Sequence, residues 1–532
     1  MYRRGMDAPQ VERNPPAAGS RVTGASGFLP RVFNRIFTRR LMNVALLMFL
    51  AVAMSGNLRR PTALLRDPDI WWHLADARIV TTTHHFIRVE PYSFTVAGER
   101  WINPEWLSEM PYWFGYRSLG LRGIYLVTII GLCANLLFVY LRSYWRSLHA
   151  GAAFWAAYLG FMLMTVNDGP RTILIAYLAM SAEMAILEAA ERGRTRLLWL
   201  LPPLFCVWIN LHGSWIIGLG LLALYILCGL FSFNKGVFEQ QAYSDKDRKR
   251  LLLVFFASLA LLILNPYGWR MIWNPFDLML NQKLNIATVE EWQPLNLSSV
   301  LGKAAFAAIC LMIVANCIRG RRWKIYELAF LFFAWFAAFD HVRFTFLASV
   351  ITIPLLAGDV ARSFYTKSDE KTIPLMNALC VTGAVCAIAA FFPTEASLQS
   401  GLAAEYPLQT IASIQPSWRT FNQDSLGGMM DFNYKSPFVD TRWDTFEHHG
   451  ELQDFLDIMH VNDPFKLLDK YRIDHVLVAE SWPLAFLLER TPGWRVEKRE
   501  GNGDDTYVLL AKTPGAGEAQ SQCAGASAQG KQ

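Results

Sequence analysis

The segment around Asp69 carries residue types that could move a proton. It runs Arg66-Asp67-Pro68-Asp69-Ile70-Trp71-Trp72-His73-Leu74. Asp67 before Pro68 is typical of a helix start, with the aspartate as cap and the proline in the first turn. Asp69 and His73 would then share one helix face. A carboxylate beside an imidazole could deprotonate an acceptor hydroxyl, or hold a divalent cation such as Mg²⁺ or Mn²⁺ through Asp67, Asp69 and His73.

A second string, Trp101-Ile102-Asn103-Pro104-Glu105-Trp106-Leu107-Ser108-Glu109, repeats this pattern. Asn103 before Pro104 again predicts a helix start, and Glu105 and Glu109 lie one turn apart on that helix. The pair is either the solvated face of an amphipathic helix or a second acidic group for the same site.

Further candidates lie in short turns between apolar segments. In Asp340-His341-Val342-Arg343, an arginine with a histidine could bind a phosphate, or an Asp–Arg pair could stabilise a tight turn. Arg171 admits the same two interpretations. His212, in Asn-Leu-His-Gly, belongs first to a helix-ending pattern, and Glu291 lies in a long polar loop.

Composition indicates the elements that must position these residues. Of 532 residues, 53% are hydrophobic and 18% are charged, and the apolar stretches reach membrane-spanning length. We predict eleven transmembrane helices, near 41–57, 121–141, 150–166, 172–189, 197–210, 214–232, 251–265, 298–317, 326–340, 344–358 and 374–391. Trp71 and Trp72 are predicted to be anchors at the membrane interface.

Loop charges predict the orientation. With the N-terminus inside, every predicted inner loop is basic, as in Arg142 with Arg146, Arg192 with Arg194, and Arg319 with Arg321. The acidic loop and the polar span ends then share the extracytoplasmic side with the C-terminus. Charged side chains at the outer ends of membrane spans are costly unless they face a cavity or partners. We therefore expect a functional cavity on the extracytoplasmic side. The alternative is interfacial solvation and capping.

Four regions follow. Residues 1–40 form a cytoplasmic N-terminal segment, 41–391 a polytopic domain with a long outer loop at 58–120, 392–511 an extracytoplasmic α/β domain, and 512–532 a disordered tail. In the α/β domain we predict strands at Pro437–Asp440, His475–Ala479, Trp494–Lys498 and Tyr507–Ala511, and helices at Leu452–His460, Pro464–Tyr471 and Leu484–Glu489. The fold class is therefore mainly α and polytopic, with a small α/β domain.

Several classes of protein are disfavoured. The sequence contains no Walker loop, Rossmann glycine pattern, HExxH or GxSxG, so nucleotide-driven pumping and soluble-type hydrolysis are not indicated. The basic residues fall in short loops and do not form a nucleic-acid patch.

The combined strings resemble a known group. Asp67-Pro-Asp-Ile-Trp-Trp-His-Leu, Asn103-Pro-Glu-Trp, Asn210-Leu-His-Gly, Asn265-Pro-Tyr-Gly, Glu291-Trp-Gln-Pro, His341-Val-Arg-Phe, Asp440-Thr-Arg and Tyr471-Arg-Ile-Asp-His-Val-Leu-Val look like uncharacterised bacterial polytopic proteins similar to the GT-C glycosyltransferases. The resemblance runs from about residue 40 to 511 and rests on fold-level analogy.

The resemblance implies an enzyme of the bacterial inner membrane that takes sugar from a polyprenyl-phosphate donor. The acceptor would be a glycan, lipid or protein of the cell envelope. Asp69 matches the expected catalytic acid of the first outer loop best, with Asp67 as the alternative. Arg343, Arg171 or His341 would stabilise the phosphate charge. His73, Glu105, His212 and Glu291 are the remaining candidates for substrate binding.

Other classes remain open. A transporter or flippase of lipid-linked saccharides predicts ionisable residues near mid-bilayer and broken helices, and Glu183, within the 172–189 span, is the chief residue of that kind. A polymerase or ligase of lipid-linked saccharides would share the donor and the side of the membrane. A non-catalytic assembly protein would use the C-terminal domain as its working part.

Overall fold

The structure is a computed structural model that describes residue 36 and residues 38–53, 65–164, 169–365, 373–501 and 506–513. Nearly all of the predicted N-terminal segment and C-terminal tail, and the start of the predicted outer loop, lie outside the described residues.

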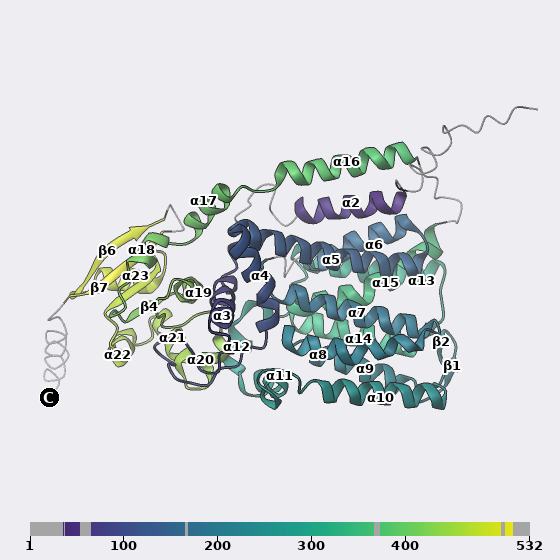
Figure 1. The fold of residues 1–532 in the computed structure, drawn as a ribbon, viewed down its shortest axis with the longest axis horizontal. Coiled ribbons are helices and arrows are strands. Elements are labelled where there is room, and N and C mark those ends of the chain that lie inside the picture. Colours follow the sequence, from purple (N-terminus) through teal and green to yellow (C-terminus); the bar gives the residue numbers. More distant parts are fainter. Residues whose placement is uncertain are drawn as a thin grey trace, which may run out of the picture.

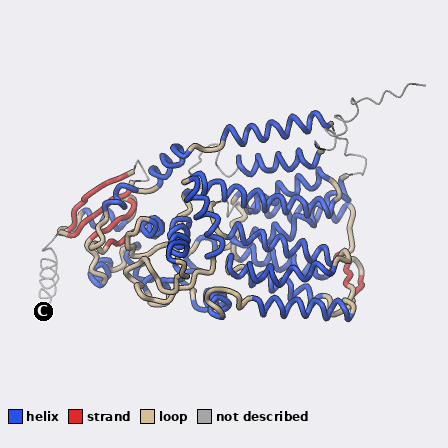
Figure 2. Tube along the Cα trace, in the orientation of Figure 1, coloured by secondary structure: helices blue, strands red, loops and turns tan. Residues whose placement is uncertain are grey.

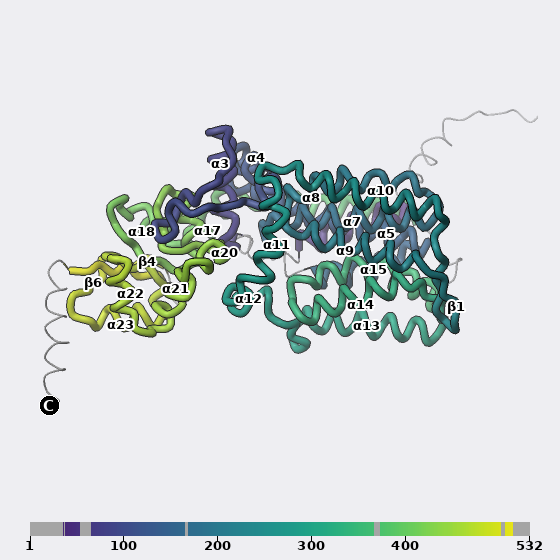
Figure 3. Tube along the Cα trace, turned by 90° about the horizontal axis from the view of Figure 1, so that it is seen from below, coloured from purple at the N-terminus to yellow at the C-terminus, as the bar shows by residue number. Residues whose placement is uncertain are grey.

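A bundle of roughly parallel and antiparallel helices makes up most of the molecule (Figures 1 and 3). Each predicted span overlaps a helix. The helices are α2 (Arg39–Val52), α5 (Leu121–Ser147), α6 (Ala150–Met164), α7 (Ile173–Glu191), η5 (Thr195–Leu200) running into α8 (Leu201–Leu211), α9 (Trp215–Cys228), α10 (Asp245–Leu261), α13 (Val300–Ile318), α14 (Ile325–Asp340), α15 (Thr345–Phe364) and α16 (Pro374–Phe391).

Five helices of the described chain are long and apolar enough to cross a membrane by length and composition: α5, α7, α13, α15 with the turn before it, and α16. Three shorter segments, Ala150–Met164, Thr195–Leu211 and Trp215–Cys228, are also apolar. The chain is therefore a membrane protein, while eleven crossings stay a prediction. Helix α15 is central and packs on α5 and α6, whereas α16 exposes most of its apolar surface.

The outer-loop elements lie between the bundle and the C-terminal domain (Figure 1). They are α3 (Asp69–Thr83), α4 (Trp106–Leu119), α11 (Trp269–Asn281), α12 (Lys283–Thr288), η6 (Glu290–Trp292) and η7 (Val342–Phe344). The interpretation of Trp71 and Trp72 as interface anchors is wrong. Both are buried, with Trp71 against Tyr406 and Phe432 and Trp72 against Trp101, because the C-terminal domain covers α3.

The C-terminal region contains a four-stranded sheet with order β4-β5-β7-β6. Strand β4 (Thr420–Asn422) runs parallel to β5 (His475–Ala479). Strand β7 (Tyr507–Lys512) is antiparallel to both β5 and β6 (Trp494–Glu500). Its helices are α17 (Glu395–Glu405), α18 (Leu408–Ser413), α19 (Asp424–Phe432), α20 (Trp443–Glu447), α21 (Glu451–Met459), α22 (Pro464–Lys470) and α23 (Pro483–Glu489). Residues between Phe421 and Leu510 supply nearly all of a separate hydrophobic core.

One predicted strand, Pro437–Asp440, is wrong. The segment is buried but irregular, because side chains rather than a neighbouring strand satisfy its backbone. The Phe438 N–H donates to Asn422 Oδ1 at 2.7 Å, and the Phe438 carbonyl accepts from the hydroxyls of Ser93 and Thr95. The strand that pairs with β5 at this edge of the sheet is β4, which was not predicted.

A second, small sheet of β1 (Phe233–Lys235), β2 (Phe238–Gln240) and β3 (Trp323–Lys324) lies at the far end of the bundle. Figure 2 shows strands at both extremes of the molecule, with helices between them. The two ends are called below the acidic end, which faces the C-terminal domain, and the basic end, which carries β1–β3.

Candidate active site at the acidic end

Two Asx-Pro turns place acidic residues where α3 and α4 begin. The Asp69 N–H donates to Asp67 Oδ1 at 3.1 Å, and the Glu105 N–H donates to Asn103 Oδ1 at 2.9 Å. In each case the side chain before the proline forms an Asx turn. The helices begin just after these turns, as predicted, but their N-cap residues are Pro68 and Glu105, without a side-chain cap bond. Because α3 packs on α4, the two turns bring their carboxylates into one cluster.

His73 lies between the glutamates of α4. Its Nδ1 is 2.9 Å from Glu109 Oε1 and its Nε2 is 3.6 Å from Glu105 Oε2. Both ring nitrogens therefore face α4, and the Asp69–His73 pair predicted from helical spacing does not form. Burial lowers the pKa of His73 well below its usual value, and the nearby His212, Arg171 and Arg442 lower it further, so the ring is neutral.

A buried polar chain continues behind His73. The Asn103 amide donates to Glu109 Oε1 at 2.7 Å and to Asp76 Oδ2 at 3.0 Å, and the Tyr92 hydroxyl donates to Asp76 Oδ1 at 2.7 Å. Burial raises the pKa of Asp76 to about 7 and holds that of Glu109 well above its usual value. These carboxyls are therefore protonated more readily than in water.

Arg171 joins three segments of the chain. Its guanidinium pairs with Asp67 and with Glu291 of the second long outer loop. The hydroxyl of the next residue, Thr172, donates to Glu105 Oε2. The residues preceding α7 thus bind acids from both Asx-Pro turns.

His212 also reaches Glu105. Its Nδ1 accepts the Ser214 N–H at 2.9 Å, so its Nε2–H is free to donate to Glu105 Oε1, 3.2 Å away. Burial, helped by the positive charge of Arg343, lowers the pKa of His212 to about 3. The imidazole is consequently a neutral donor at physiological pH.

The turn before α15 is only partly in the cluster. Arg343 lies over the Trp292 ring, 4.2 Å from its centre. Burial raises the pKa of Glu105, and the Thr172 hydroxyl and the charges of Arg343 and Arg171 oppose that rise. His341 instead lies with Nδ1 2.6 Å from the Trp292 carbonyl oxygen and Nε2 3.4 Å from Asp340. His341 therefore anchors the Glu290–Trp292 turn, and the alternative Asp340–Arg343 pair is replaced by these contacts.

Asp69 occupies the junction with the C-terminal domain. Helix α19 approaches so closely that a Cβ on Gly428 would lie 2.7 Å from the Pro68 carbonyl oxygen. Burial and the neighbouring Asp67 carboxylate raise the pKa of Asp69 to about 7, against the opposing effects of Arg171 and of the Thr441 hydroxyl. A carboxyl with a pKa near neutrality is suited to accept a proton at physiological pH.

Three residues of this site, Asp440, Thr441 and Arg442, were not among the site residues predicted from the sequence. Arg442 is buried and pairs with Glu90 at 2.9 Å and with Asp440, while its guanidinium lies 4.6 Å from the Trp101 ring centre. This arginine fastens the C-terminal domain to the outer loop and so holds Thr441 near Asp69. The sequence signal that could have identified these residues is the Asp440-Thr-Arg string, which belongs to the family resemblance.

Comparisons with known proteins bear on the fold. No protein-family model and no curated protein matches the sequence. Among solved structures, the apo oligosaccharyltransferase of Archaeoglobus fulgidus aligns with a TM-score of 0.52 and 12% identity, over 83% of this chain and 69% of that chain. AglB of the same organism, in complex with an inhibitory peptide and a dolichol-phosphate, aligns with a TM-score of 0.51 and 12% identity, over 82% of this chain and 69% of that chain. ArnT from Cupriavidus metallidurans, bound to undecaprenyl phosphate, aligns with a TM-score of 0.47 and 15% identity, over 92% of this chain and 99% of that chain.

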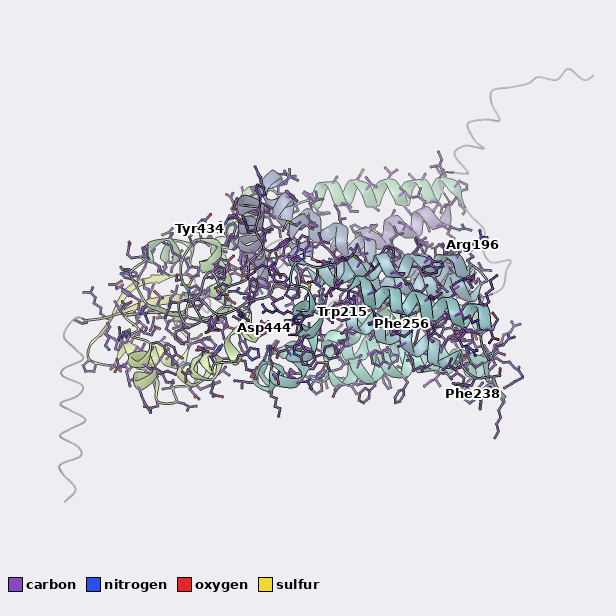
Figure 4. The ribbon with its side chains drawn as sticks, turned by 60° about the horizontal axis from the view of Figure 1, so that its bottom comes forward. Arg196, Trp215, Phe238, Phe256, Tyr434 and Asp444 are labelled. Atoms are coloured by element: carbon purple, nitrogen blue, oxygen red, sulfur yellow. The ribbon has the colours of Figure 1, made fainter. Side chains whose placement is uncertain are left out.

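The chain has a GT-C-like fold. At such identities the similarity concerns the fold alone, and residue roles must come from the site itself. Figure 4 shows Asp444 where the C-terminal domain meets the bundle, with Trp215 at the adjoining end of α9. Burial raises the pKa of Asp444 to about 6, so the C-terminal domain adds a further acid at this junction.

The metal prediction gains no geometric support. Among the residues that the structure describes, no three His, Cys, Asp or Glu side chains are grouped to hold an ion. Asp67 faces Arg171 and His73 faces the glutamates of α4, so these two predicted ligands are directed to different partners. The side chains of the predicted cavity are likewise engaged with one another.

Proposed function

We propose that the protein is a membrane glycosyltransferase that transfers a sugar from a polyprenyl-phosphate donor to a cell-envelope acceptor on the extracytoplasmic face. The observation that carries this proposal is the position of Asp69. It is a carboxyl of pKa about 7, next to the guanidinium that binds Asp67, at the junction of the bundle with an extramembrane domain.

The proposed reaction is a single displacement. Asp69 accepts the proton of the acceptor hydroxyl as that oxygen bonds to the anomeric carbon of the sugar. The bond between the anomeric carbon and the phosphate oxygen breaks, and polyprenyl phosphate leaves with the electron pair. Arg171 and Arg343 stabilise the negative charge that develops on the phosphate.

Phosphate binding would exchange partners within the cluster. Arg171 is held by Asp67 and by Glu291, and Glu291 lies on a one-turn element next to Trp292. An incoming phosphate would take the place of the Glu291 carboxylate, while Asp67 keeps Arg171 oriented. In this proposal, the neutral rings of His73 and His212, with Glu105 between them, hydrogen-bond sugar hydroxyls.

The proposed topology follows from the two ends. Arginines of the predicted inner loops gather at the basic end, which we assign to the cytoplasmic side of a bacterial inner membrane. The acidic end and the C-terminal domain are then extracytoplasmic. The dolichol-phosphate in the AglB complex supports a lipid-phosphate ligand for a fold of this kind.

A transporter of lipid-linked saccharides is the second candidate, and Glu183 favours it. This glutamate is fully buried within α7, and neither of its oxygens has a hydrogen-bond partner among the described residues. Buried acids within membrane-spanning helices commonly mark ion or substrate paths. Glu183→Gln should impair translocation of a fluorescent lipid-linked saccharide in vesicles only if this candidate is correct.

Sugar transfer tests the main proposal. Purified full-length protein is given labelled polyprenyl-phosphate sugars and envelope extracts. The Asp69→Asn variant is compared with wild type and with a control, Asp469→Asn, which changes an exposed aspartate of the C-terminal domain. We expect Asp69→Asn to lower transfer at least ~100-fold and the control to match wild type. Equal transfer by all three proteins would remove the role of Asp69 as base. Absence of transfer from every donor would overturn the enzyme proposal.

A further inference from the structure

A large cavity lies at the basic end, away from the proposed active site. It has a volume of about 860 Å³ and is formed where α5, α13 and α15 end and α6 begins. Among the described residues, five arginines line it, and Asp359 is the one carboxylate in the lining. Such a volume suits a small ligand, and the lining favours an anion.

An ion-pair network that adjoins the cavity holds fewer carboxylates than arginines. Glu188 pairs with Arg142 and Arg146, Glu327 with Arg146 and Arg321, and Asp359 with Arg321 and Arg362. Arg321 Nη2 is buried and has no hydrogen-bond partner among the described residues. Each carboxylate is therefore shared between two guanidinium groups.

Two arginines of the rim are exposed and hydrogen-bond main-chain carbonyls. Arg192 donates to the Trp145 carbonyl at 3.3 Å and Arg319 to the Arg362 carbonyl at 3.4 Å. With these included, the described residues of the cavity and of the adjoining network contain six guanidinium groups and three carboxylates, an excess of three positive charges. Ordinary loop solvation does not explain why so many arginines converge on one hollow.

His149 adds a directed donor. Only 6% of this residue is exposed. Its Nδ1 accepts the Ala152 N–H at 3.1 Å, so the proton resides on Nε2, which is buried and lacks a hydrogen-bond partner in the part of the chain described. His149 lines the cavity immediately before α6, whose N-terminal dipole also favours an anion.

The surroundings of the cavity indicate a lipid rather than a soluble anion. Leu148 lines the rim and is 72% exposed, held at φ 51° by its N–H bond to the Tyr144 carbonyl. Ile318 and Phe364, which end α13 and α15, also present exposed apolar side chains at this level. A ligand with a charged head and acyl chains would satisfy both the arginines and these apolar groups. Basic pockets between membrane helices bind lipid headgroups in this way.

We propose that this cavity binds the phosphate headgroup of an anionic membrane lipid, between the guanidinium groups of Arg192, Arg319 and Arg321 and the imidazole of His149. The site is separate from the proposed active site and does not depend on it. Its ligand chemistry is a phosphate ester that carries a net negative charge and apolar chains.

Binding of short-chain lipids to the full-length protein in neutral detergent tests the proposal. The probes are dihexanoyl phosphatidylglycerol, the zwitterionic dihexanoyl phosphatidylcholine and inorganic phosphate. The test variant is Arg192→Gln with Arg319→Gln. The control is Arg248→Gln with Arg322→Gln, which removes the same charge from arginines outside the cavity lining. Arg192, Arg319 and Arg322 are exposed and Arg248 is half-buried, so both variants should fold.

We expect saturable binding of phosphatidylglycerol, at least tenfold weaker in the cavity variant and changed less than twofold in the control. Phosphatidylcholine and inorganic phosphate should bind at least tenfold more weakly than phosphatidylglycerol. Equal losses in both variants would show a diffuse surface field and overturn the site. Inorganic phosphate binding as tightly as the lipid would overturn the assignment to a lipid.

Discussion

The two ends of the helical bundle contain opposite charge arrangements. At the acidic end, four carboxyl groups (Asp67, Asp69, Glu105 and Glu291) lie near Arg171 and Arg343, and Asp76 and Glu109 lie near Arg442. In and beside the cavity of the basic end, Glu188, Glu327 and Asp359 are shared among four arginines, and Arg192 and Arg319 bind main-chain carbonyls. Excess acid in a buried place raises carboxyl pKa values, whereas excess guanidinium, which does not lose its proton, keeps carboxylates charged.

The difference separates chemistry from binding. Carboxyls with pKa values near 7, such as Asp69 and Asp76, can exchange protons at physiological pH. Guanidinium groups cannot, and they offer a fixed positive charge to an anion. The acidic end is therefore the place for a reaction that moves protons, and the basic end is suited to holding a charged group in place.

The largest effect should come from Arg442, on which the acidic end depends for its contact with the C-terminal domain. Arg442→Met would leave Glu90 and Asp440 buried without their partner, which should destabilise the protein by about 3–5 kcal/mol. Unfolding by denaturant in detergent measures this. Arg495→Met, an exposed site in the same domain, should change stability little. Equal effects would contradict the role of Arg442 as the fastening group.

The same substitution at the two ends should give different results. Glu327→Gln would remove the carboxylate between Arg146 and Arg321 and cost roughly 3 kcal/mol, because two buried guanidinium groups lose their shared partner. Glu109→Gln should cost less than about 1 kcal/mol, since burial raises the pKa of Glu109 well above its usual value and an amide oxygen can still accept from Asn103. Unfolding midpoints of the two variants would decide, and a larger loss in Glu109→Gln would contradict the comparison.

The pH dependence of transfer should report Asp69. Its pKa is raised to about 7, so transfer should rise with pH through that value, because the base acts only when deprotonated. Asp67→Asn removes the charge that raises this pKa, and it also frees Arg171. The midpoint of the pH profile should therefore move about one unit lower. An unchanged midpoint, measured on single-turnover transfer, would show that another group titrates.

The smallest effect is expected at an exposed pair of the basic end. Arg322 lies 3.5 Å from Glu239, and their side chains are 56% and 40% exposed. Arg322→Ala should change stability by about 0–1 kcal/mol, and added salt should reduce that difference further. A loss as large as that of Glu327→Gln would mean that burial does not distinguish the charges of this end.

Much of the fold was predictable because its signals are local. Apolar stretches predicted where the bundle helices lie, and the Asx-Pro pairs predicted the starts of α3 and α4, since an Asx turn depends on a residue two positions away. The strand predicted at Pro437–Asp440 failed for the opposite reason. Its apolar pattern is a strand pattern, but Asn422 and the outer loop, far away in sequence, satisfy its backbone.

The acidic residues at helix starts and the basic loops were already evident in the sequence, because capping and the distribution of charge between loops depend on neighbouring residues. The partners of those charges were decided by tertiary structure. Arg171 meets Asp67 across 104 residues, and Arg442 meets Glu90 across 352. Helical spacing placed His73 beside Asp69, yet packing of α3 on α4 turned the ring to Glu109. Burial at the domain junction then raised the pKa of Asp69, and burial is a property of the packed molecule that no local pattern contains.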